Sequence, residues 1–335
     1  MRVGIAGPGN QAGKIAKAMQ KAESALRCTV YLHREGAAPS KDLRGPAFEP
    51  TSRLDDLASC QAVVIASPNE AHASQVRALL AAGYDGYIFL EKPPAQDERD
   101  IDWLESLSEG TRRKIFVNFN YRRSVYFRGL VRDAERFGLG ALLSVNVSTS
   151  HGLGLNPSYG GSWRASREHH AGGVFETVAI HFLDMLVLLR GAPERADLMA
   201  SVHSPYGDAP DNCLLSCLFP GGVTLSVTAS YTAPFMSSFT ALYENGVVTY
   251  GDEKTVRAPR ETFDESGLFS QPPVVHREPV QRKTIARDSL AESVEGFLRA
   301  VRSGEGFALE EYAAAMETSR VAARLVARTR RDFGS

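Results

Sequence analysis

The first third of the chain alternates short apolar runs with segments of helical periodicity. Met1 to Gly7 (MRVGIAG) is apolar and ends in glycine, and Ala12 to Ala22 carries small and apolar residues at helical spacing. The pattern repeats, with further strands expected at 28–32, 62–66, 86–90 and 114–119 and further helices at 70–82 and 97–107. Alternation of this kind predicts a parallel, doubly wound α/β sheet.

After Arg123 the alternation stops and extended segments follow one another. Strands are expected at 141–149, 214–219, 223–231 and 239–243, with FPGGV as a hairpin turn. A helix is expected from about Val174 to Arg190, and two amphipathic helices in the tail from Asp288, separated by RSGEGFAL. The prediction is an N-terminal Rossmann domain over 1–122 and a C-terminal α+β domain over 123–335, whose sheet is open and mostly antiparallel.

Composition narrows the class of ligand. The 335 residues are 43% hydrophobic and carry a net charge of -1, which allows two proper cores and gives no excess of positive charge for a nucleic acid. The four cysteines form no C-x-x-C pair, and we find neither a charged leader nor a long apolar span. We expect a reduced, cytoplasmic protein with a small-molecule ligand and no membrane or nucleic-acid partner.

The first turn has the composition of a phosphate-binding loop. GPGNQA, from Gly7 to Ala12, fits G-x-G-x-x-A between a strand and a helix. Gly7 permits the tight turn and Gly9 lets the backbone approach a pyrophosphate, which the helix N-terminus holds. We therefore expect Asn10, Gln11 and Ala12 to line a dinucleotide site with these glycines.

The end of the second strand bears on which nicotinamide dinucleotide binds. VYLHREG puts His33 and Arg34 where a site specific for NAD usually has a carboxylate, and none occurs before Glu35. An arginine can hold a 2'-phosphate bidentately, so NADP is predicted to be preferred, with NAD possible. The alternative is that Arg34 is a solvated loop charge.

An acid and a base stand side by side after the fourth predicted strand. Glu91 and Lys92 follow an apolar run, and Pro93 and Pro94 stop the strand from continuing. Ligands of doubly wound sheets bind beyond the carboxyl ends of the strands, so this loop faces the expected crevice. That position favours a functional lysine over a surface ion pair.

Five motifs in order carry a specific resemblance. They are ASPNEAH (66–72), EKPPA (91–95), NFNYRR (118–123), GSWR (161–164) and GGVFETVAIHFLDML (172–186). In this set the chain resembles the glucose-fructose oxidoreductase, inositol dehydrogenase and rhizopine catabolism (Gfo/Idh/MocA) family of nicotinamide-dependent sugar oxidoreductases. The resemblance covers nearly the whole chain and implies a second domain with helices on one sheet face and an outer face used for dimer contacts.

The resemblance also implies roles for residues of the first domain. The E-K-P match puts Lys92 near the nicotinamide and the reacting carbinol, where it can move the proton of the oxygen while hydride passes. Cofactor contacts are implied for Ser67, Asn69 and His72, with Pro68 holding the loop shape, for Glu91, and for Asn120 and Arg122 on the nicotinamide and substrate side. A solvent-facing His72 in the first turn of a helix is an equal alternative.

In the second domain the resemblance implies that His181 shares proton transfer with Lys92. The position four residues before it, usually a carboxylate, is Thr177, while Glu176 lies about one hundred degrees round an α-helix. Thr177 can bond a sugar hydroxyl but cannot orient His181 as a carboxylate would, which points away from plain inositol as substrate. Trp163 and Arg164 belong to the loop that closes over nicotinamide and substrate.

Other polar groups have plainer interpretations. His169 and His170 are adjacent, but no further residue completes a recognisable metal-ligand set, so no metal is expected. Cys213 and Cys217 are expected to be small core residues on one face of a strand.

The combined prediction is an NADP-preferring oxidoreductase acting on a secondary alcohol or ketone of a sugar, nucleotide-sugar or cyclitol, as a keto-sugar reductase or a sugar dehydrogenase. The substrate contacts are expected from Lys92, Arg122, Trp163, Arg164, Thr177 and His181. A homodimer or homotetramer through the C-terminal sheet is expected. Two rivals remain open, a lyase or glycosidase that retains NAD and uses transient oxidation, and a non-catalytic dinucleotide or sugar sensor.

Overall fold

A computed structural model describes residues 1–32, 39–260 and 263–332 of the chain. Its contacts divide the chain into two compact units, which we describe one at a time. The first unit comprises residues 1–120 with 287–323, and the second comprises residues 121–286 with the chain from 324 onward. The tail helices α7 (Ile285–Ser303) and α8 (Leu309–Asp332), which the sequence predicted, each contribute to both units. The boundary after residue 122, between a dinucleotide-binding domain and a second α+β domain, stays a prediction.

The first unit is built on a six-stranded sheet whose neighbours all run parallel, in the order β3-β2-β1-β4-β5-β6. The order in which strands are added reverses after β3: β2 and β3 lie on one side of β1, and β4, β5 and β6 lie on the other. This is the strand order of a doubly wound dinucleotide-binding fold. The strands are β1 (Arg2–Ala6), β2 (Arg27–Tyr31), β3 (Phe48–Thr51), β4 (Ala62–Ile65), β5 (Tyr87–Glu91) and β6 (Ile115–Asn118). The predicted fold is confirmed, although the edge strand β3 was not predicted.

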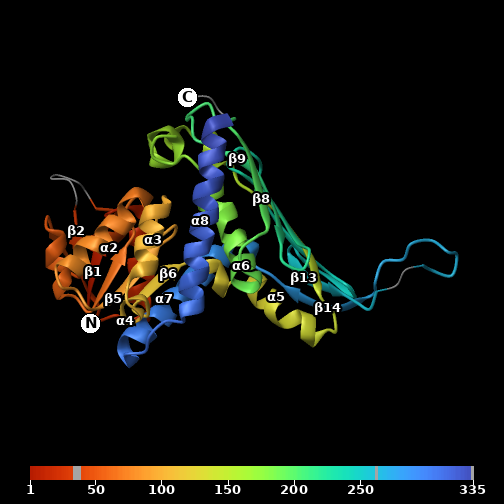
Figure 1. The fold of residues 1–335 in the computed structure, drawn as a ribbon, viewed down its shortest axis with the longest axis horizontal. Coiled ribbons are helices and arrows are strands. Elements are labelled where there is room, and N and C mark those ends of the chain that lie inside the picture. Colours follow the sequence, from red (N-terminus) through yellow and green to blue (C-terminus); the bar gives the residue numbers. More distant parts are fainter. Residues whose placement is uncertain (33–38, 261–262, 333–335) are drawn as a thin grey trace. The chain divides into compact units, whose positions relative to one another are not determined.

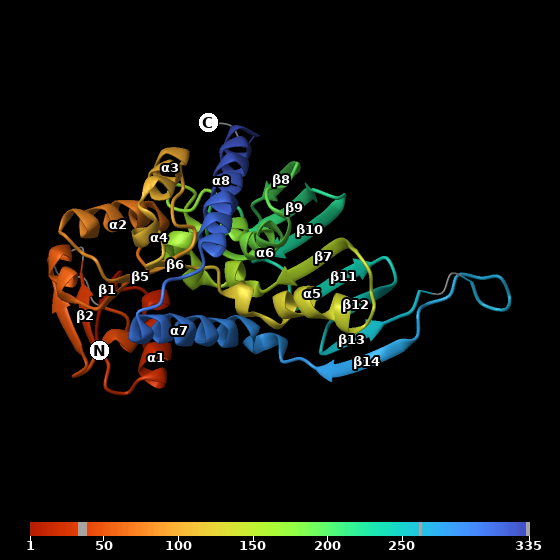
Figure 2. The same ribbon diagram turned by 60° about the horizontal axis from the view of Figure 1, so that its bottom comes forward.

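Helices cover both faces of this sheet (Figure 2). Helices α1 (Asn10–Ala22) and α7 lie on one face, and α2 (His72–Ala81) and α3 (Glu98–Ser106) lie on the other; the short α4 (Glu109–Arg112) leads into β6. Ile15 and Met19 of α1 share one buried cluster with Val294 and Phe297 of α7. The ring of Phe297 meets Phe89 of β5 edge to face, with centroids 5.2 Å apart. Burial of each such side chain contributes roughly 1.5–3 kcal/mol, so α7 is part of this core.

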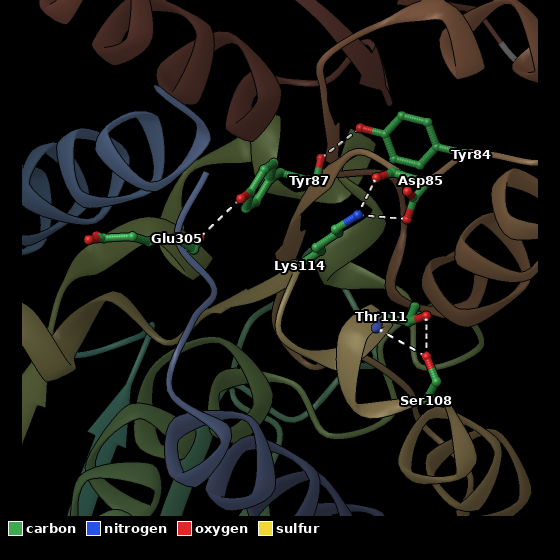
Figure 3. A network of polar contacts seen from close by, with 7 residues as sticks. All are labelled: Tyr84, Asp85, Tyr87, Ser108, Thr111, Lys114 and Glu305. Carbon is green, nitrogen blue, oxygen red and sulfur yellow. Dashed lines mark hydrogen bonds and ion pairs between the residues drawn. The ribbon is translucent and has the colours of Figure 1, made fainter. Parts of the chain in front are cut away.

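The amino ends of β5 and β6 are closed by polar contacts (Figure 3). Lys114, just before β6, donates from Nζ to the backbone oxygen and to Oδ1 of Asp85 at 2.9 and 2.7 Å. Tyr84 donates to the carbonyl oxygen of Tyr87 at 2.8 Å, and the Tyr87 hydroxyl donates to that of Glu305 at 3.1 Å. These contacts fix the amino ends of the two strands. Ligands of doubly wound sheets bind at the opposite, carboxyl ends of the strands, where the candidate site is described below.

The second unit holds an eight-stranded sheet in the order β14-β13-β12-β11-β7-β10-β9-β8. Among the described strands of this sheet, β7 and β10 pair in parallel and all other neighbours pair antiparallel. The predicted open, mostly antiparallel sheet is confirmed. The strands are β7 (Leu142–Ser150), β8 (Arg195–Ser201), β9 (Asn212–Phe219), β10 (Val223–Ser230), β11 (Met236–Tyr243), β12 (Gly246–Tyr250), β13 (Glu253–Arg257) and β14 (Val274–Pro279).

One face of this second sheet is covered by α5 (Val125–Arg136) and α6 (Ile180–Arg190) (Figure 1). The buried side chains alternate along the strands, and Cys213 and Cys217 lie among them as predicted. The outer face instead presents hydroxyl and amide side chains, among them Asn146, Ser226 and Thr240 in one row across three strands.

Between β13 and β14 an arm extends from the sheet (Figures 1 and 2). Phe263 stacks on Phe269 at 5.3 Å around a turn in which Asp264 Oδ1 accepts from the backbone of Ser266 and Leu268. Phe269 is 88% exposed, so the arm carries an uncovered apolar tip. In the described parts of the chain, no helix is both long and apolar enough to cross a membrane.

Candidate functional site

The turn between β1 and α1 has the geometry of an anion cradle. Gly7 has φ +112°, and a Cβ there would lie 2.6 Å from the backbone nitrogen of Ser67, so only glycine fits. Gly9 precedes α1, and a Cβ on it would meet nothing within 4 Å. Within the described chain no side chain caps this helix N-terminus, and its first turn holds no acidic residue. These features fit a dinucleotide pyrophosphate, and Asn10, Gln11 and Ala12 begin the helix.

Glu91, the last residue of β5, ties three elements of this end together. It is 6% exposed, and its Oε1 accepts from Gln11 Nε2 at 3.0 Å and from Asn118 Nδ2 at 2.7 Å. Two amide donors therefore hold the buried carboxylate. Asn118, at the end of β6, was not among the predicted site residues. A polar residue closing an apolar strand beside the crevice was the signal that could have found it.

Lys92 follows Glu91 directly and is half-buried, while Pro93 and Pro94 are buried. Because the preceding carboxylate is held by α1 and β6, the backbone from which the lysine projects is fixed at the carboxyl end of β5. This is the position that the sequence predicted for it.

His72, the first residue of α2, is fully buried, which excludes the solvent-facing alternative. Its Nδ1 lies 2.8 Å from the carbonyl oxygen of Pro93, and its Nε2 lies 3.0 Å from that of Ser67. Burial lowers the pKa of the imidazole below its usual value, against the opposing effect of these two carbonyl oxygens. The histidine thus joins the loop after β4 to the loop after β5.

The loop after β4 is ordered by its own contacts. Ser67 donates from Oγ to Gln75 Oε1 at 2.7 Å, and Pro68 precedes the 3₁₀ turn η3 (Asn69–Ala71). The carbonyl oxygen of Pro68 accepts from the backbone nitrogen of Ala71 at 2.9 Å. The contacts of Ser67 and Asn69 with a cofactor stay predictions.

Two predicted cofactor residues after β2, His33 and Arg34, lie outside the described residues. Asn120, which follows β6, donates from Nδ2 to Ser289 Oγ of α7 at 2.9 Å. Its predicted approach to the nicotinamide stays a prediction.

In the second unit, His181 lies in the first turn of α6 and is 7% exposed. The ring of Tyr121 stacks on it, with centroids 4.6 Å apart and planes at 21°. Arg122 donates from Nε and Nη2 to the two carboxylate oxygens of Asp184 at 2.7 and 2.6 Å. Residues 121 and 122 therefore contact α6 at two positions three residues apart, on one face of the helix. Neither Tyr121 nor Asp184 was predicted, although the spacing of Asp184 from His181 was readable.

A π-helical turn, η8 (Phe175–Ala179), leads into α6, and the backbone nitrogen of Ile180 donates back to the carbonyl oxygen of Phe175. Thr177 in this turn contacts the Tyr231 hydroxyl, whose pKa is raised by burial. Glu176 accepts from the backbone nitrogen of Gly172 at 3.0 Å and lies 3.7 Å from His170 Nε2. The carboxylate is thus engaged by the loop that precedes the turn.

In the loop predicted to close over the substrate, three side chains lie in contact with one another. The guanidinium carbon of Arg164 lies 4.9 Å from the Trp163 ring centroid, and Trp163 meets the buried His170 edge to face at 4.7 Å. The neighbouring His169 is exposed. Among the residues with described positions, no group of three or more His, Cys, Asp or Glu side chains has the arrangement of a metal site.

Comparisons with known proteins agree with this architecture. Residues 1–119 match the model of an oxidoreductase family with an NAD-binding Rossmann fold, and residues 134–257 match the GFO/IDH/MocA C-terminal domain. The protein is thus a dinucleotide-binding oxidoreductase built from two such parts. It belongs to the Gfo/Idh/MocA family, so the predicted family and enzyme class are confirmed.

The individual proteins that the chain is similar to share a quarter or less of its residues. The chain is 25% identical over 316 residues to inositol 2-dehydrogenase of Rhizobium meliloti (strain 1021), covering 91% of this chain and 89% of the relative. The fold is similar to levoglucosan dehydrogenase in complex with NADH (TM-score 0.75, 19% identity, 99% and 97% of the two chains). It is also similar to GenD2 from gentamicin A biosynthesis in complex with NAD (TM-score 0.73, 17% identity, 99% and 95%).

Proposed function

We propose that the protein transfers hydride between a nicotinamide dinucleotide and a secondary alcohol or ketone of a sugar, nucleotide-sugar or cyclitol. The observation that carries the proposal is the fixation of the Lys92 loop by three cofactor-side elements, through Gln11, Asn118 and His72. The names of relatives that act on inositol and levoglucosan support a polyhydroxylated substrate.

In this proposal Lys92 handles the proton of the reacting oxygen. Its neutral amine accepts the hydroxyl proton when a carbinol is oxidised, and its ammonium returns that proton to the oxygen when a ketone is reduced. A bound nicotinamide would supply or accept the hydride. The Glu91 side chain, whose Oε1 accepts from two amides, fixes the residue from which the chain continues into the lysine.

His181 is proposed to assist from the substrate side. Thr177 stands where a carboxylate would otherwise restrain the imidazole, and the stacked ring of Tyr121 is one contact that supports the orientation of His181. Trp163, Arg164 and Thr177 are proposed to contact the substrate, and Arg122 to act on the nicotinamide and substrate side.

Preference for NADP over NAD is part of the proposal. Its support is the sequence after β2, which ends at Tyr31 and is followed by His33 and Arg34 without a carboxylate before Glu35. A guanidinium there would pair with a 2'-phosphate.

We also propose that copies of the chain associate through the outer face of the second sheet. That face is rich in uncharged hydroxyl and amide side chains, and the nearby arm has an apolar tip at Leu268 and Phe269. An isologous dimer would cover both features.

The test is a screen of the purified protein with NAD⁺ and NADP⁺ against myo-inositol, levoglucosan and a panel of aldoses and UDP-sugars. The absorbance of the reduced nicotinamide reports turnover. Turnover of any polyol, with a higher kcat/KM for NADP⁺, is expected. Tight nicotinamide binding with no net redox turnover on the panel would instead favour the lyase or glycosidase, and binding of neither nicotinamide would favour the sensor.

A further inference from the structure

The imidazole of His72 lies between two acceptors. The carbonyl oxygens of Pro93 and Ser67 face its two ring nitrogens at 2.8 and 3.0 Å, and the ring is fully buried. Neither oxygen can donate a hydrogen bond, so each contact is favourable only when the ring nitrogen opposite carries a proton.

The number of protons on the ring therefore decides how many bonds it makes. A neutral imidazole has one N–H and can hold one carbonyl, whereas an imidazolium holds both. The shorter contact is the one to Pro93, and burial disfavours the charged ring. The charged side chains whose fields act on the ring are Glu91, which favours the cation, and Lys92, which opposes it.

The two carbonyls belong to the two loops that flank the reacting end of the proposed site. Pro93 is joined covalently to Lys92, and Ser67 begins the loop after β4. A hydrogen bond to the Pro93 carbonyl restrains the peptide group between Pro93 and Pro94, one residue beyond the lysine. The bonds that Gln11 and Asn118 donate to the Glu91 carboxylate restrain the residue that precedes the lysine. His72 and Glu91 thus fix Lys92 from its two sides along the chain.

We propose that His72 is a positioning residue for Lys92, acting through an Nδ1–H that donates to the Pro93 carbonyl. The inference rests on the proposed catalytic use of Lys92, but the restraint itself can be measured without turnover. A buried histidine that merely fills the core would make no distinction between its two nitrogens.

Two near-isosteric replacements separate the nitrogens. In His72→Asn the amide nitrogen can take the place of Nδ1, and in His72→Gln it can take the place of Nε2. Hydrogen exchange, followed by mass spectrometry on the NADH-bound protein, reports on the backbone amides of Glu91, Lys92, Ala95 and Gln96 in one peptide and of residues 66–72 in another. His72→Leu removes both donors and is the reference for complete loss.

We expect exchange of the 91–96 amides to stay near the wild-type rate in His72→Asn. In His72→Gln it should rise roughly fivefold to a hundredfold, the range that follows from losing a buried hydrogen bond. The 66–72 amides should show the opposite order. Equal effects of Asn and Gln on both peptides, the reversed order, or no change in either variant would overturn the proposal. The Asn and Gln pair decides the question even where His72→Leu fails to fold.

A second readout connects the restraint to chemistry. With a sugar found active in the nicotinamide screen, kcat should be about tenfold lower in His72→Gln than in His72→Asn, while the NADH affinities of the two variants differ less. If hydrogen exchange gives the expected order but no sugar is turned over, the restraint is real and the proposed function of Lys92 is what fails.

Discussion

Arg122 and Asp184 form a two-pronged ion pair whose side chains are only 3% and 1% exposed. The sequence suggested that Arg122 reaches toward cofactor and substrate, yet its Nε and one Nη are occupied by the carboxylate. The pair joins the segment after β6 to α6, the helix that carries His181. Its first effect is therefore on how α6 is held in the second unit.

Arg122→Leu should lower the free energy of unfolding by about 3–5 kcal/mol, because it leaves the Asp184 carboxylate buried without its partner. Urea denaturation measures this directly. Arg53→Leu is the matched control, since Arg53 pairs with Asp55 at the surface and such pairs contribute about 0–1 kcal/mol. Equal losses in the two variants would contradict a structural role for the buried pair. A large loss of NADH affinity in a stably folded Arg122→Lys would add a direct role in binding.

The two glycines of the first turn should respond differently to the same substitution. Gly7→Ala should destabilise the fold by about 1–3 kcal/mol, because the new Cβ meets the backbone at a positive φ. Gly9→Ala should leave stability within about 0.5 kcal/mol, because its Cβ enters open space. It should nevertheless weaken dinucleotide binding by roughly tenfold or more, since that space is where the pyrophosphate would lie. Thermal unfolding and a fluorescence titration with NADPH measure the two effects, and unchanged binding in Gly9→Ala would argue against the cradle.

Stability should decline on mild acidification. Burial lowers the pKa of His72 and of His151 below the ordinary value of 6.5. As pH falls, the histidines of the unfolded chain therefore take up protons before those of the folded chain, which favours the unfolded state. The contribution of the two neutral histidines to the free energy of unfolding is complete above about pH 6.5 and is lost progressively below it. Urea denaturation between about pH 7.5 and about pH 5.5 should show this decline. In His72→Asn the free energy of unfolding should fall less steeply with falling pH. An equal slope in the variant would mean that His72 does not titrate as inferred.

Charge placed on the outer face of the second sheet should prevent association. Asn146 is exposed on the central strand β7, so Asn146→Arg in both copies of a two-fold contact would bring like charges together. Light scattering after size exclusion should then show a smaller species than the wild type. Lys17→Glu, a charge change on the exposed side of α1, is the control and should leave the mass unchanged. A wild-type monomer would contradict the proposed oligomer outright.

The alternation of strand and helix was readable because β1, β4, β5 and β6 are short apolar runs with helical spacing between them. Strand β3 (FEPT) escaped because it is a four-residue edge strand with a proline and little apolar surface. Strands β8 and β14 form the two edges of the second sheet and contain no buried residue, so they lack the apolar pattern by which a strand is predicted. Strands β12 and β13 are five-residue strands that pair across a tight turn, with Tyr250 opposite Lys254, and they were also not predicted.

The site was predictable where backbone chemistry decides it and less so where tertiary contacts do. Gly7 and Gly9 follow from the demands of the turn, and Lys92 from its place after β5. The carbonyl oxygens around His72 and the pairing of Arg122 with Asp184 arise only when separate segments meet. The π-helical turn before His181 changes the helical angle on which the expected position of Glu176 relied.

The proton-transfer role of Lys92 is tested most sharply by Lys92→Met, with nicotinamide affinity and turnover measured side by side on the same preparation. We expect kcat to fall by about 10²–10⁴-fold, as for loss of a general acid or base, and the Kd for NADPH or NADH to stay within about threefold of wild type. Turnover retained at the wild-type rate, with binding intact, would contradict the role given to Lys92 and with it the proposed mechanism.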